Sequence, residues 1–323
     1  MTDDLIPTVD PTAAPTDAAV EPRVLTPHIV LGRVVMLVNP ASGSVGPTAA
    51  AEAEAILAEY ACEASVVSLE SGGFDGQIQA ALDAKPDVLF VLAGDGTAGT
   101  IASRAGPDGP LVAPLPGGTM NMLPRALYGT ADWKAALRLA LEEGAPQCVA
   151  GGEVSDGQTS AVFYCAAILG SPALWAPARE AMREGRLKLA WMYARRALRR
   201  AFSGKMRFSL DGRAPRRAEA LVLISPMISR AMDENTGLEA AAMNPSDAAQ
   251  AFRLAAHAVF SDWRQDPAVT TRAIQRATVS ARSRIPAVID GEPILLAHEA
   301  KVKFIRNAFQ ALAPNPPAAE DSV

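Results

Sequence analysis

The sequence predicts an α/β protein with an N-terminal, mostly parallel sheet and a second, strand-rich α+β domain. Two observations support this. Between residues 33 and 116, short apolar runs alternate with stretches rich in Ala, Glu and Leu, the pattern of strands joined by crossover helices. After about residue 145, short strand-like segments follow one another and only two stretches look helical.

The N-terminal elements are assigned in chain order. We expect strands wherever a short apolar run is bounded by polar or turn-forming residues, at 33–38, 64–69, 87–92 and 111–115. Helices are expected at 48–60 and 74–84, the second with Ile78 and Leu82 on one face. The order of these elements predicts a parallel sheet, at whose carboxyl edge ligands bind.

The second domain is expected to consist mainly of short strands, at 147–155, 159–169, 205–212, 217–225, 275–281, 284–290 and 300–306. Long helical stretches are expected at about 173–203 and near 247–263. We place the domains at 29–144 and 145–313, with the last strand a candidate for returning to the first domain. The ends, 1–28 and 314–323, are rich in Pro and Ala and are expected to be disordered tails.

Composition excludes several classes of function. The net charge is −5 and the sequence pI is about 5.4, so we expect no nucleic-acid partner. The three cysteines and three histidines are isolated, which disfavours a disulfide framework and a zinc site. The chain begins with acidic residues and lacks the apolar core of a signal peptide. We therefore expect a cytoplasmic protein.

Three glycine-containing loops follow directly on expected strand ends. Their candidate ligand-binding residues are Asn39, Ser42 and Gly43 in the first loop, Gly94, Asp95, Gly96 and Thr97 in the second, and Gly117, Gly118, Thr119 and Asn121 in the third. Glycines let backbone N–H groups approach an anion closely. Each loop alone can also be explained as a turn before a capped helix. Together, at one sheet edge, they predict a site for nucleotide phosphates.

Asp95 needs a separate explanation, because a carboxylate repels a phosphate. Its position makes sense if Mg²⁺ or a hydroxyl group lies between the two, which makes Asp95 the candidate metal ligand. The alternative is that Asp95 only forms hydrogen bonds within its own turn. Thr97 is expected to cap the helix that follows.

The ordered set NPASG (39–43), GDGT (94–97), PGGTMN (116–121) and IDGE (289–292) resembles the diacylglycerol kinase catalytic family. That family includes bacterial lipid kinases and the sphingosine and ceramide kinases, and the resemblance covers about residues 32 to 313. It implies an N-terminal nucleotide domain, a β-sandwich-like C-terminal domain and a cleft between them. It also implies transfer of the γ-phosphoryl group of ATP to a lipid hydroxyl, with Mg²⁺.

The resemblance assigns a role to each motif. The residues of the three loops would hold the nucleotide, Asp290 would be the general base, and Glu292 would assist it. The chemistry of the IDGE motif can also be inferred without the family resemblance, because a carboxylate at a strand end can accept the proton of the attacking hydroxyl. A lone Asp-Gly-Glu is more often a hairpin turn, and only its order and distance relative to the other loops favour a functional role.

The sequence departs from the family at three acidic positions. Thr100, Met122 and the surroundings of Gly151 lack the carboxylates that family members often carry. These losses leave diacylglycerol, ceramide and a sphingoid base open as the lipid. Two other functions also stay open: a soluble kinase similar to NAD kinases, which share GDGT, and a regulator that binds lipid or nucleotide without catalysis.

A basic segment points to a membrane surface. Residues 179–207 contain ten Lys or Arg interleaved with aromatic and aliphatic residues, as in helices that lie on anionic lipid. The alternative is a solvated helix that packs its apolar face on the second domain. We expect a peripheral protein on the cytoplasmic face of a membrane, and the number of subunits stays open, with a dimer as one option.

Overall fold

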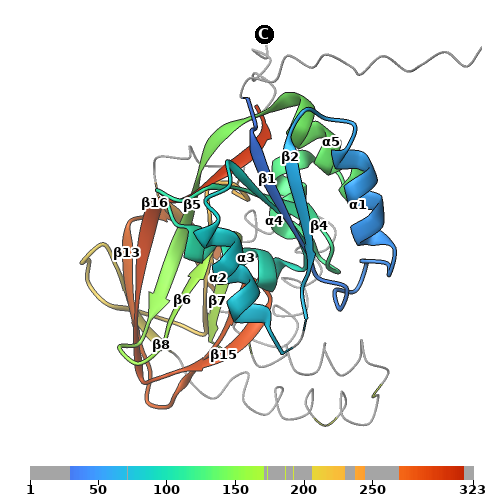
Figure 1. The fold of residues 1–323 in the computed structure, drawn as a ribbon. Coiled ribbons are helices and arrows are strands. Elements are labelled where there is room, and N and C mark those ends of the chain that lie inside the picture. Colours follow the sequence, from blue (N-terminus) through green and yellow to red (C-terminus); the bar gives the residue numbers. More distant parts are fainter. Residues whose placement is uncertain are drawn as a thin grey trace, which may run out of the picture.

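The computed structural model describes residues 30–70, 72–170, 206–229, 237–243 and 269–315, together with Ala173, Arg186 and Met192. These residues form a ten-stranded sheet flanked by helices at its N-terminal end, and a separate six-stranded sheet (Figure 1). None of the described helices is long and apolar enough to cross a membrane.

The N-terminal part alternates strands and helices. Its elements are β1 (Arg33–Val38), α1 (Ala49–Leu57), β2 (Glu63–Ser68), α2 (Phe74–Asp83), β3 (Val88–Ala93), α3 (Asp95–Ala105), β4 (Leu111–Pro116), α4 (Met122–Tyr128) and α5 (Trp133–Glu143). The strands lie in the order β2-β1-β3-β4 and are parallel. The loops that follow β1, β3 and β4 therefore meet at one edge of the sheet.

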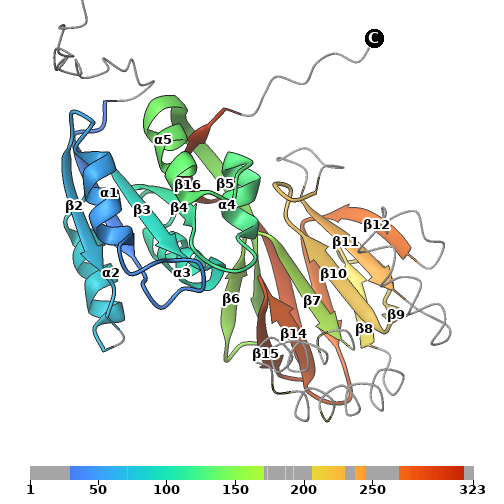
Figure 2. The same ribbon diagram turned by 90° about the vertical axis from the view of Figure 1, so that its right-hand side faces the viewer.

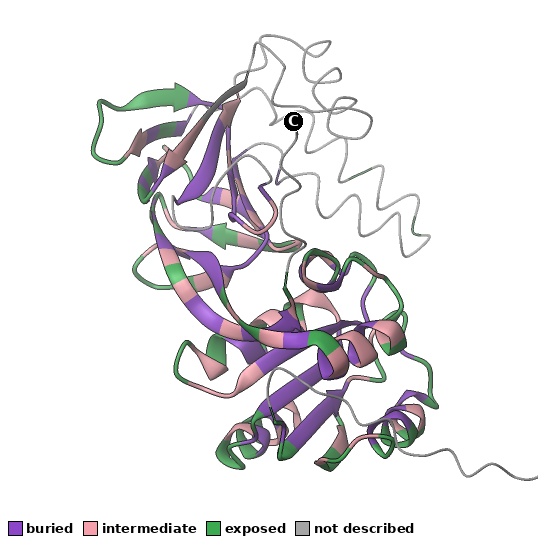
Figure 3. Ribbon diagram, turned by 90° about the horizontal axis from the view of Figure 1, so that it is seen from above, coloured by how far each residue is buried: buried purple, intermediate pink, exposed green. Residues whose placement is uncertain are grey.

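Both faces of this parallel sheet are covered, which is why its strands are continuous apolar runs. Successive side chains of a strand point to opposite faces. Met36 and Phe90 accordingly pack in a buried cluster with α1 and α5. Leu37 and Val91 pack in another cluster with α2 and α3. Figure 3 shows the central strands as buried along their length.

The C-terminal part is built from antiparallel strands. They are β5 (Gly144–Ser155), β6 (Ser160–Phe163), β7 (Ala166–Gly170), β8 (Met206–Leu210), β9 (Arg216–Ala218), β10 (Ala220–Ile224), β11 (Leu238–Met243), β12 (Val269–Ile274), β13 (Arg276–Ser280), β14 (Ile285–Ile289), β15 (Glu292–Leu296) and β16 (Glu299–Pro314). The six-stranded sheet has the order β12-β11-β10-β7-β14-β15. One apolar cluster joins residues of both sheets, such as Phe163 and Val302 from the large sheet and Leu169 and Leu223 from the small one. The two sheets thus form a sandwich, and the expected fold class is confirmed (Figure 2).

β16 connects the two parts. It is antiparallel to β13 and β5 and parallel to β4, where Ala311 pairs with Val112. Its register with β5 shifts between Ile305 and Phe309, as at a β-bulge, which bends a strand. The domain limits near residue 145 stay a prediction, because β5 and β16 run through both parts.

Most expected strands are present, but several elements differ from the sequence-based expectations. The segment 159–169 forms two strands, β6 and β7, because the N–H groups between them bond to a side chain described below. The segment 217–225 also divides, into β9 and β10, and 300–306 extends to Pro314. The sequence analysis assigned no element to α4, α5, β11, β12 or β15. The expected helices at 173–203 and near 247–263 fall almost wholly outside the described residues.

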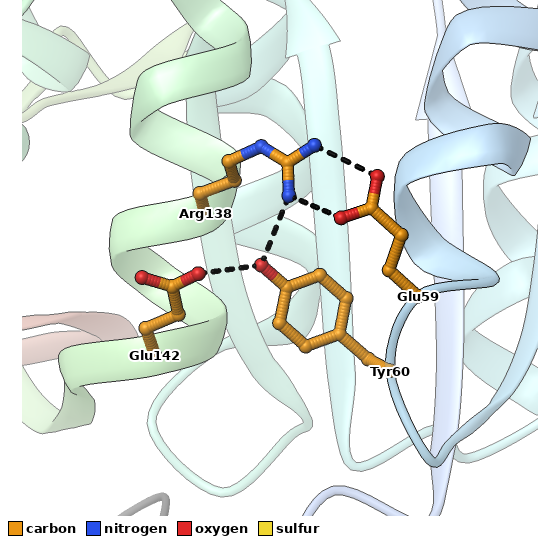
Figure 4. A network of polar contacts seen from close by, with 4 residues as sticks. All are labelled: Glu59, Tyr60, Arg138 and Glu142. Atoms are coloured by element: carbon orange, nitrogen blue, oxygen red, sulfur yellow. Dashed lines mark hydrogen bonds and ion pairs between the residues drawn. The ribbon is translucent and has the colours of Figure 1, made fainter. Parts of the chain in front are cut away.

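Helices α1 and α5 are joined at the surface by a polar network (Figure 4). The guanidinium of Arg138 donates to both carboxylate oxygens of Glu59, at 2.7 and 2.9 Å. The hydroxyl of Tyr60 donates to Glu142 at 2.8 Å and lies 3.4 Å from Arg138. Solvent screens such exposed pairs, so the network orients α5 on α1 more than it stabilises the fold.

A buried tyrosine fixes the far end of β16. The hydroxyl of Tyr128 at the end of α4 donates to the carbonyl of Leu312 at 2.6 Å. Leu312 lies opposite Pro146 of β5, and a proline has no N–H to donate. Tyr128 therefore supplies a hydrogen bond to a carbonyl that its strand partner cannot serve.

Replacing Tyr128 with Phe should destabilise the protein more than the same change at Tyr60. Tyr128→Phe leaves a buried carbonyl without a partner, which costs about 1–3 kcal/mol, whereas Tyr60→Phe removes an ordinary bond worth about 0.5–1.5 kcal/mol. Urea unfolding of both variants measures the difference. Equal midpoints would show that the Tyr128 bond contributes no more than the surface network.

Candidate active site between the glycine loops and the β14–β15 turn

The first loop, after β1, is hydrogen-bonded to the other two loops. The hydroxyl of Ser42 accepts the N–H of Gly94 at 3.1 Å, and Asn39 Nδ2 lies 3.5 Å from Thr97 Oγ1. Ser44 donates its N–H to the carbonyl of Gly117 at 3.1 Å and its hydroxyl to that of Gly118 at 3.0 Å. Ser44 is a residue that the sequence analysis did not include in the site, although it lies in the polar run Ser-Gly-Ser.

The second and third loops approach each other so closely that glycine is required. A Cβ on Gly118 would lie 2.7 Å from Cα of Gly94, and a Cβ on Gly117 would lie 2.6 Å from the backbone N of Ala93. A Cβ on Gly43 would lie 3.4 Å from the hydroxyl of Thr119. The sequence-predicted residues of all three loops therefore lie together at one edge of the sheet.

Helix α3 begins inside the GDGT motif. Gly94 is its extended N-cap, and the first intrahelical bond runs from the N–H of Ala98 to the Gly94 carbonyl at 3.0 Å. The expectation that Thr97 caps the helix is wrong, because Thr97 already lies in the first turn. The N–H groups of Asp95, Gly96 and Thr97 precede that first bond. Such groups, with the positive end of the helix dipole, suit a phosphate.

Asp95 and Asn121 hold the starts of α3 and α4 in place. The Asp95 carboxylate accepts the N–H of Leu123 in α4 at 3.3 Å. The buried amide of Asn121 accepts the N–H of Gly118 at 2.7 Å and donates to its carbonyl at 2.9 Å. Asn121 itself has a left-handed backbone, with φ of 50°. It therefore shapes the third loop, and its side chain is used within that loop.

The IDGE motif forms a tight hairpin turn. Ile289 pairs with Glu292, which leaves Asp290 and Gly291 as a two-residue loop with φ of 44° and 94°. Two successive positive φ values are the requirement of a type I′ turn, for which Asp-Gly is a preferred sequence. The turn interpretation of this motif is correct, and the turn also carries the predicted site residues.

The Asp290 carboxylate is bound by three consecutive backbone N–H groups. Oδ2 accepts from Tyr164 at 2.7 Å, and Oδ1 accepts from Cys165 at 3.0 Å and from Ala166 at 2.8 Å. Burial raises the pKa of Asp290; the three N–H groups oppose this shift, and the nearby Asp95 adds to it. The carboxylate thus lies in the connection between β6 and β7, within electrostatic reach of the GDGT loop.

Glu292 lies beside the start of α3. A Cβ on Gly96 would be 3.5 Å from Glu292 Oε1. Glu292 is exposed and, in the part of the chain that the structure describes, its side chain makes no hydrogen bond or ion pair. The turn of the C-terminal part and the glycine-loop edge of the N-terminal part therefore face each other, as the motif order predicted.

Tyr164 links the two parts at this point, and the sequence analysis missed it. Its hydroxyl and that of Ser103 in α3 are 2.8 Å apart, and its ring packs edge-on against Phe309 of β16 at 5.0 Å. Burial raises the pKa of Tyr164 to about 12, so the phenol stays protonated at neutral pH. The only sequence signal was an aromatic residue followed by small ones, at 164–167.

The positions that lack the three family carboxylates have other structural roles among the described residues. Thr100 donates its hydroxyl to the carbonyl of Gly96, and Met122 packs against the apolar cluster under α3. Gly151 has no room for a side chain, because a Cβ would lie 2.6 Å from the carbonyl oxygen of Phe163. Glu153 accepts a hydrogen bond from Ser160 instead.

The described residues contain no group of three or more His, Cys, Asp or Glu side chains that could hold a metal ion by itself. Mg²⁺ often uses only one or two carboxylates together with substrate phosphates. Asp95, at the start of α3, is compatible with that arrangement. The close approach of glycine backbones beside the free N–H groups of α3 is likewise compatible with a nucleotide phosphate.

Comparison with protein families identifies the N-terminal part. Residues 33–150 match the model of the diacylglycerol kinase catalytic domain. This segment belongs to that family. The family is one of kinases that use ATP, which agrees with the phosphate site predicted at the three loops. No curated protein matches the chain.

Solved structures show that the fold extends beyond the matched kinase domain. Three structures from Bacillus anthracis str. Sterne, one described as a diacylglycerol kinase and two as candidates for that activity, cover 88% of this chain and 97–98% of their own. Their TM-scores are 0.62, 0.64 and 0.63, at 13%, 15% and 17% sequence identity. At these identities the likeness establishes the fold of both parts.

Replacing Gly118 with Ala should weaken ATP binding by on the order of tenfold, equivalent to ~1.4 kcal/mol. The added methyl group would force the second and third loops of the kinase domain apart. Gly76→Ala is the matched control, because a Cβ there meets nothing within 4 Å and the change favours helix α2 by about 1 kcal/mol. Calorimetric titration with ATP compares the two. Equal affinity would show that the loops can separate without affecting the nucleotide.

Proposed function

We propose that this protein is an ATP-dependent lipid kinase. The observation that carries the proposal is that an Asp-Gly-Glu turn of the C-terminal sandwich lies against the start of α3 in a kinase catalytic domain. Phosphoryl transfer needs a positioned phosphate, neutralised charge and an acceptor for the hydroxyl proton. The glycine loops and α3 would position the phosphate, and the turn would supply the acceptor for the hydroxyl proton.

The chain's own residues divide these tasks. The N–H groups at the start of α3 and the backbones of Gly94 and Gly118 would hold the phosphates of ATP. Asp95 would hold Mg²⁺, which lowers the negative charge of the phosphates. A carboxylate of the β14–β15 turn would accept the proton of the attacking hydroxyl, help that is typically worth ~10²–10⁴-fold in rate. Tyr164 and Asp290 keep this turn next to α3.

The hydroxyl donor is proposed to be a membrane lipid: diacylglycerol, ceramide or a sphingoid base. Support comes from the fold, which this chain shares with the bacterial proteins described as diacylglycerol kinases or candidates. The basic segment 179–207 is proposed to bind an anionic membrane surface, and it lies almost wholly outside the described residues. Peripheral attachment on the cytoplasmic face of a membrane is part of the same proposal.

One set of observations favours a second candidate, a regulator that binds lipid or nucleotide without catalysis. The positions of Thr100, Met122 and Gly151 carry no carboxylate, and Gly151 has no space for one. Such a protein would bind ATP and transfer no phosphate.

The proposal is tested by transfer of labelled γ-phosphate from Mg·ATP to lipids in mixed micelles containing diacylglycerol, monoacylglycerol, ceramide or sphingosine. We expect one lipid class to be labelled, and the label to fall by at least ~10²-fold in the double variant Asp290→Asn/Glu292→Gln. ATP binding without any labelled lipid would contradict the kinase and favour the regulator. Labelling of a soluble acceptor such as NAD in the absence of lipid would contradict the lipid substrate.

A further inference from the structure

The C-terminal sandwich has a cavity at the edge where its two sheets end. β9 is the last strand of the large sheet, and β12 is the last strand of the small one. A cavity of about 100 Å³ lies between them and is lined by residues of β8, β9, β11, β12 and the β8–β9 turn. Figure 2 shows β9 and β12 on the opposite side of the molecule from β1 and β2. The cavity is therefore separate from the glycine loops.

The floor of this cavity is apolar. Phe208 and Leu210 of β8 line it together with Ala242 of β11. The two β8 side chains share one face, because alternate residues of a strand point the same way. All three belong to the apolar cluster between the sheets, or pack against it. Leu210 and Ala242 are only half-buried, so the core of the sandwich is partly open at this edge.

The rim of the cavity carries three arginines. Arg213 follows the β8–β9 turn, Arg216 lies in β9 and Arg272 lies in β12. Arg213 and Arg216 are exposed, and Arg272 is half-buried. The side chains of all three make no hydrogen bond or ion pair with any residue in the described ranges. Three guanidinium groups thus surround an apolar floor without a carboxylate partner.

The surrounding hairpin does not balance this charge. Residues 206–218 contain four arginines and one acidic residue, Asp211, in a chain whose net charge is −5. Asp211 and Gly212 form a turn with φ of 48° and 71°. Oδ1 of Asp211 accepts the backbone N–H groups of Gln275 and Arg276, both at 2.9 Å. The one carboxylate of the hairpin therefore fastens the turn to the junction of β12 and β13.

This arrangement is suited to an anion. Like charges that are held close together repel each other, and a bound anion between them removes that cost. A guanidinium group donates two parallel hydrogen bonds to a phosphate, which an ammonium group cannot do. The apolar floor has room for a part of the ligand that carries no charge.

We propose that the cavity rimmed by Arg213, Arg216 and Arg272 binds a phosphate group. The phosphate is either free in solution or part of a lipid headgroup whose apolar portion contacts Phe208 and Leu210. This site is distinct from the nucleotide site at the glycine loops. It does not rest on the proposed function, because binding here involves no phosphoryl transfer.

The decisive variant is Arg213→Gln/Arg216→Gln. Arg282→Gln/Lys301→Gln is the matched control, because it removes the same charge at two exposed positions outside the cavity. Both variants should keep the wild-type Tm, since the side chains at all four positions are exposed. Calorimetric titration with inorganic phosphate should show a Kd about 10²-fold higher for the arginine variant than for the control. Phosphate that binds at the glycine loops is common to both variants and cancels in this comparison.

Arg213→Lys/Arg216→Lys separates a shaped site from general attraction. This variant keeps both positive charges and loses the planar guanidinium groups. We expect its Kd for phosphate to be about tenfold higher than that of the wild type. Wild-type affinity in the lysine variant would contradict a site shaped for phosphate and would leave only attraction by net charge.

Vesicles distinguish the two sources of the phosphate. Sedimentation with phosphatidylcholine vesicles that contain phosphatidic acid is compared with sedimentation with phosphatidylcholine alone. If the ligand is a lipid headgroup, the arginine variant should bind the phosphatidic acid vesicles more weakly than the control variant does. Loss of phosphate binding with unchanged vesicle binding would assign the site to free phosphate. If the arginine variant loses neither, relative to the control, the proposal is wrong.

Discussion

The structure depends on one strand, β16, that belongs to both halves of the protein. Its first residues pair with β13, and its last residues lie between β4 and β5. The strand follows β15 after only Ala297 and His298, and Ala297 donates its N–H to Asp156 at 2.7 Å. The end of β15 is therefore tied to β16 and, through Asp156, to the connection between β5 and β6. This constraint, together with Tyr164 packed between α3 and β16, places Glu292 beside Gly96.

Charge balance has a consequence for how this site would work. The three loops contain no Lys or Arg, while Asp95, Asp290 and Glu292 all lie near the start of α3. Burial raises the pKa of Asp290, and repulsion by the nearby Asp95 adds to this rise. Backbone N–H groups and a helix dipole supply only partial positive charges. A bound nucleotide triphosphate would therefore depend on a divalent cation more strongly than in a site with basic side chains.

The sequence was sufficient for the parts of the fold that rest on local pattern. The apolar runs of β1, β3 and β4 and the glycines that follow them defined the sheet and its functional edge, because buried parallel strands have no polar alternation. The partners of Asp290 were not predictable. Its carboxylate bonds to backbone N–H groups more than 120 residues earlier in the chain, and backbone groups leave no mark in a sequence. Ser44 and Tyr164 were not predicted from the sequence for the same reason, because each forms hydrogen bonds with backbone or hydroxyl groups that are distant in the chain.

The Asp-Gly-Glu motif can form a hairpin turn and also belong to a functional site. Its Asp and Gly are explained by the turn conformation, and its Glu is not. A left-handed two-residue turn favours Asp followed by Gly for conformational reasons alone. Asp211 and Gly212 show that this chain also uses the pair outside the three glycine loops and the β14–β15 turn. Glutamate, in contrast, is depleted in strands, and Glu292 begins the edge strand β15 with no side-chain bond to any of the described residues. Departures from local preference concentrate at functional sites. The bonds of Asp290 to three backbone N–H groups explain the aspartate in this turn, whereas no side-chain bond of the described residues explains the glutamate.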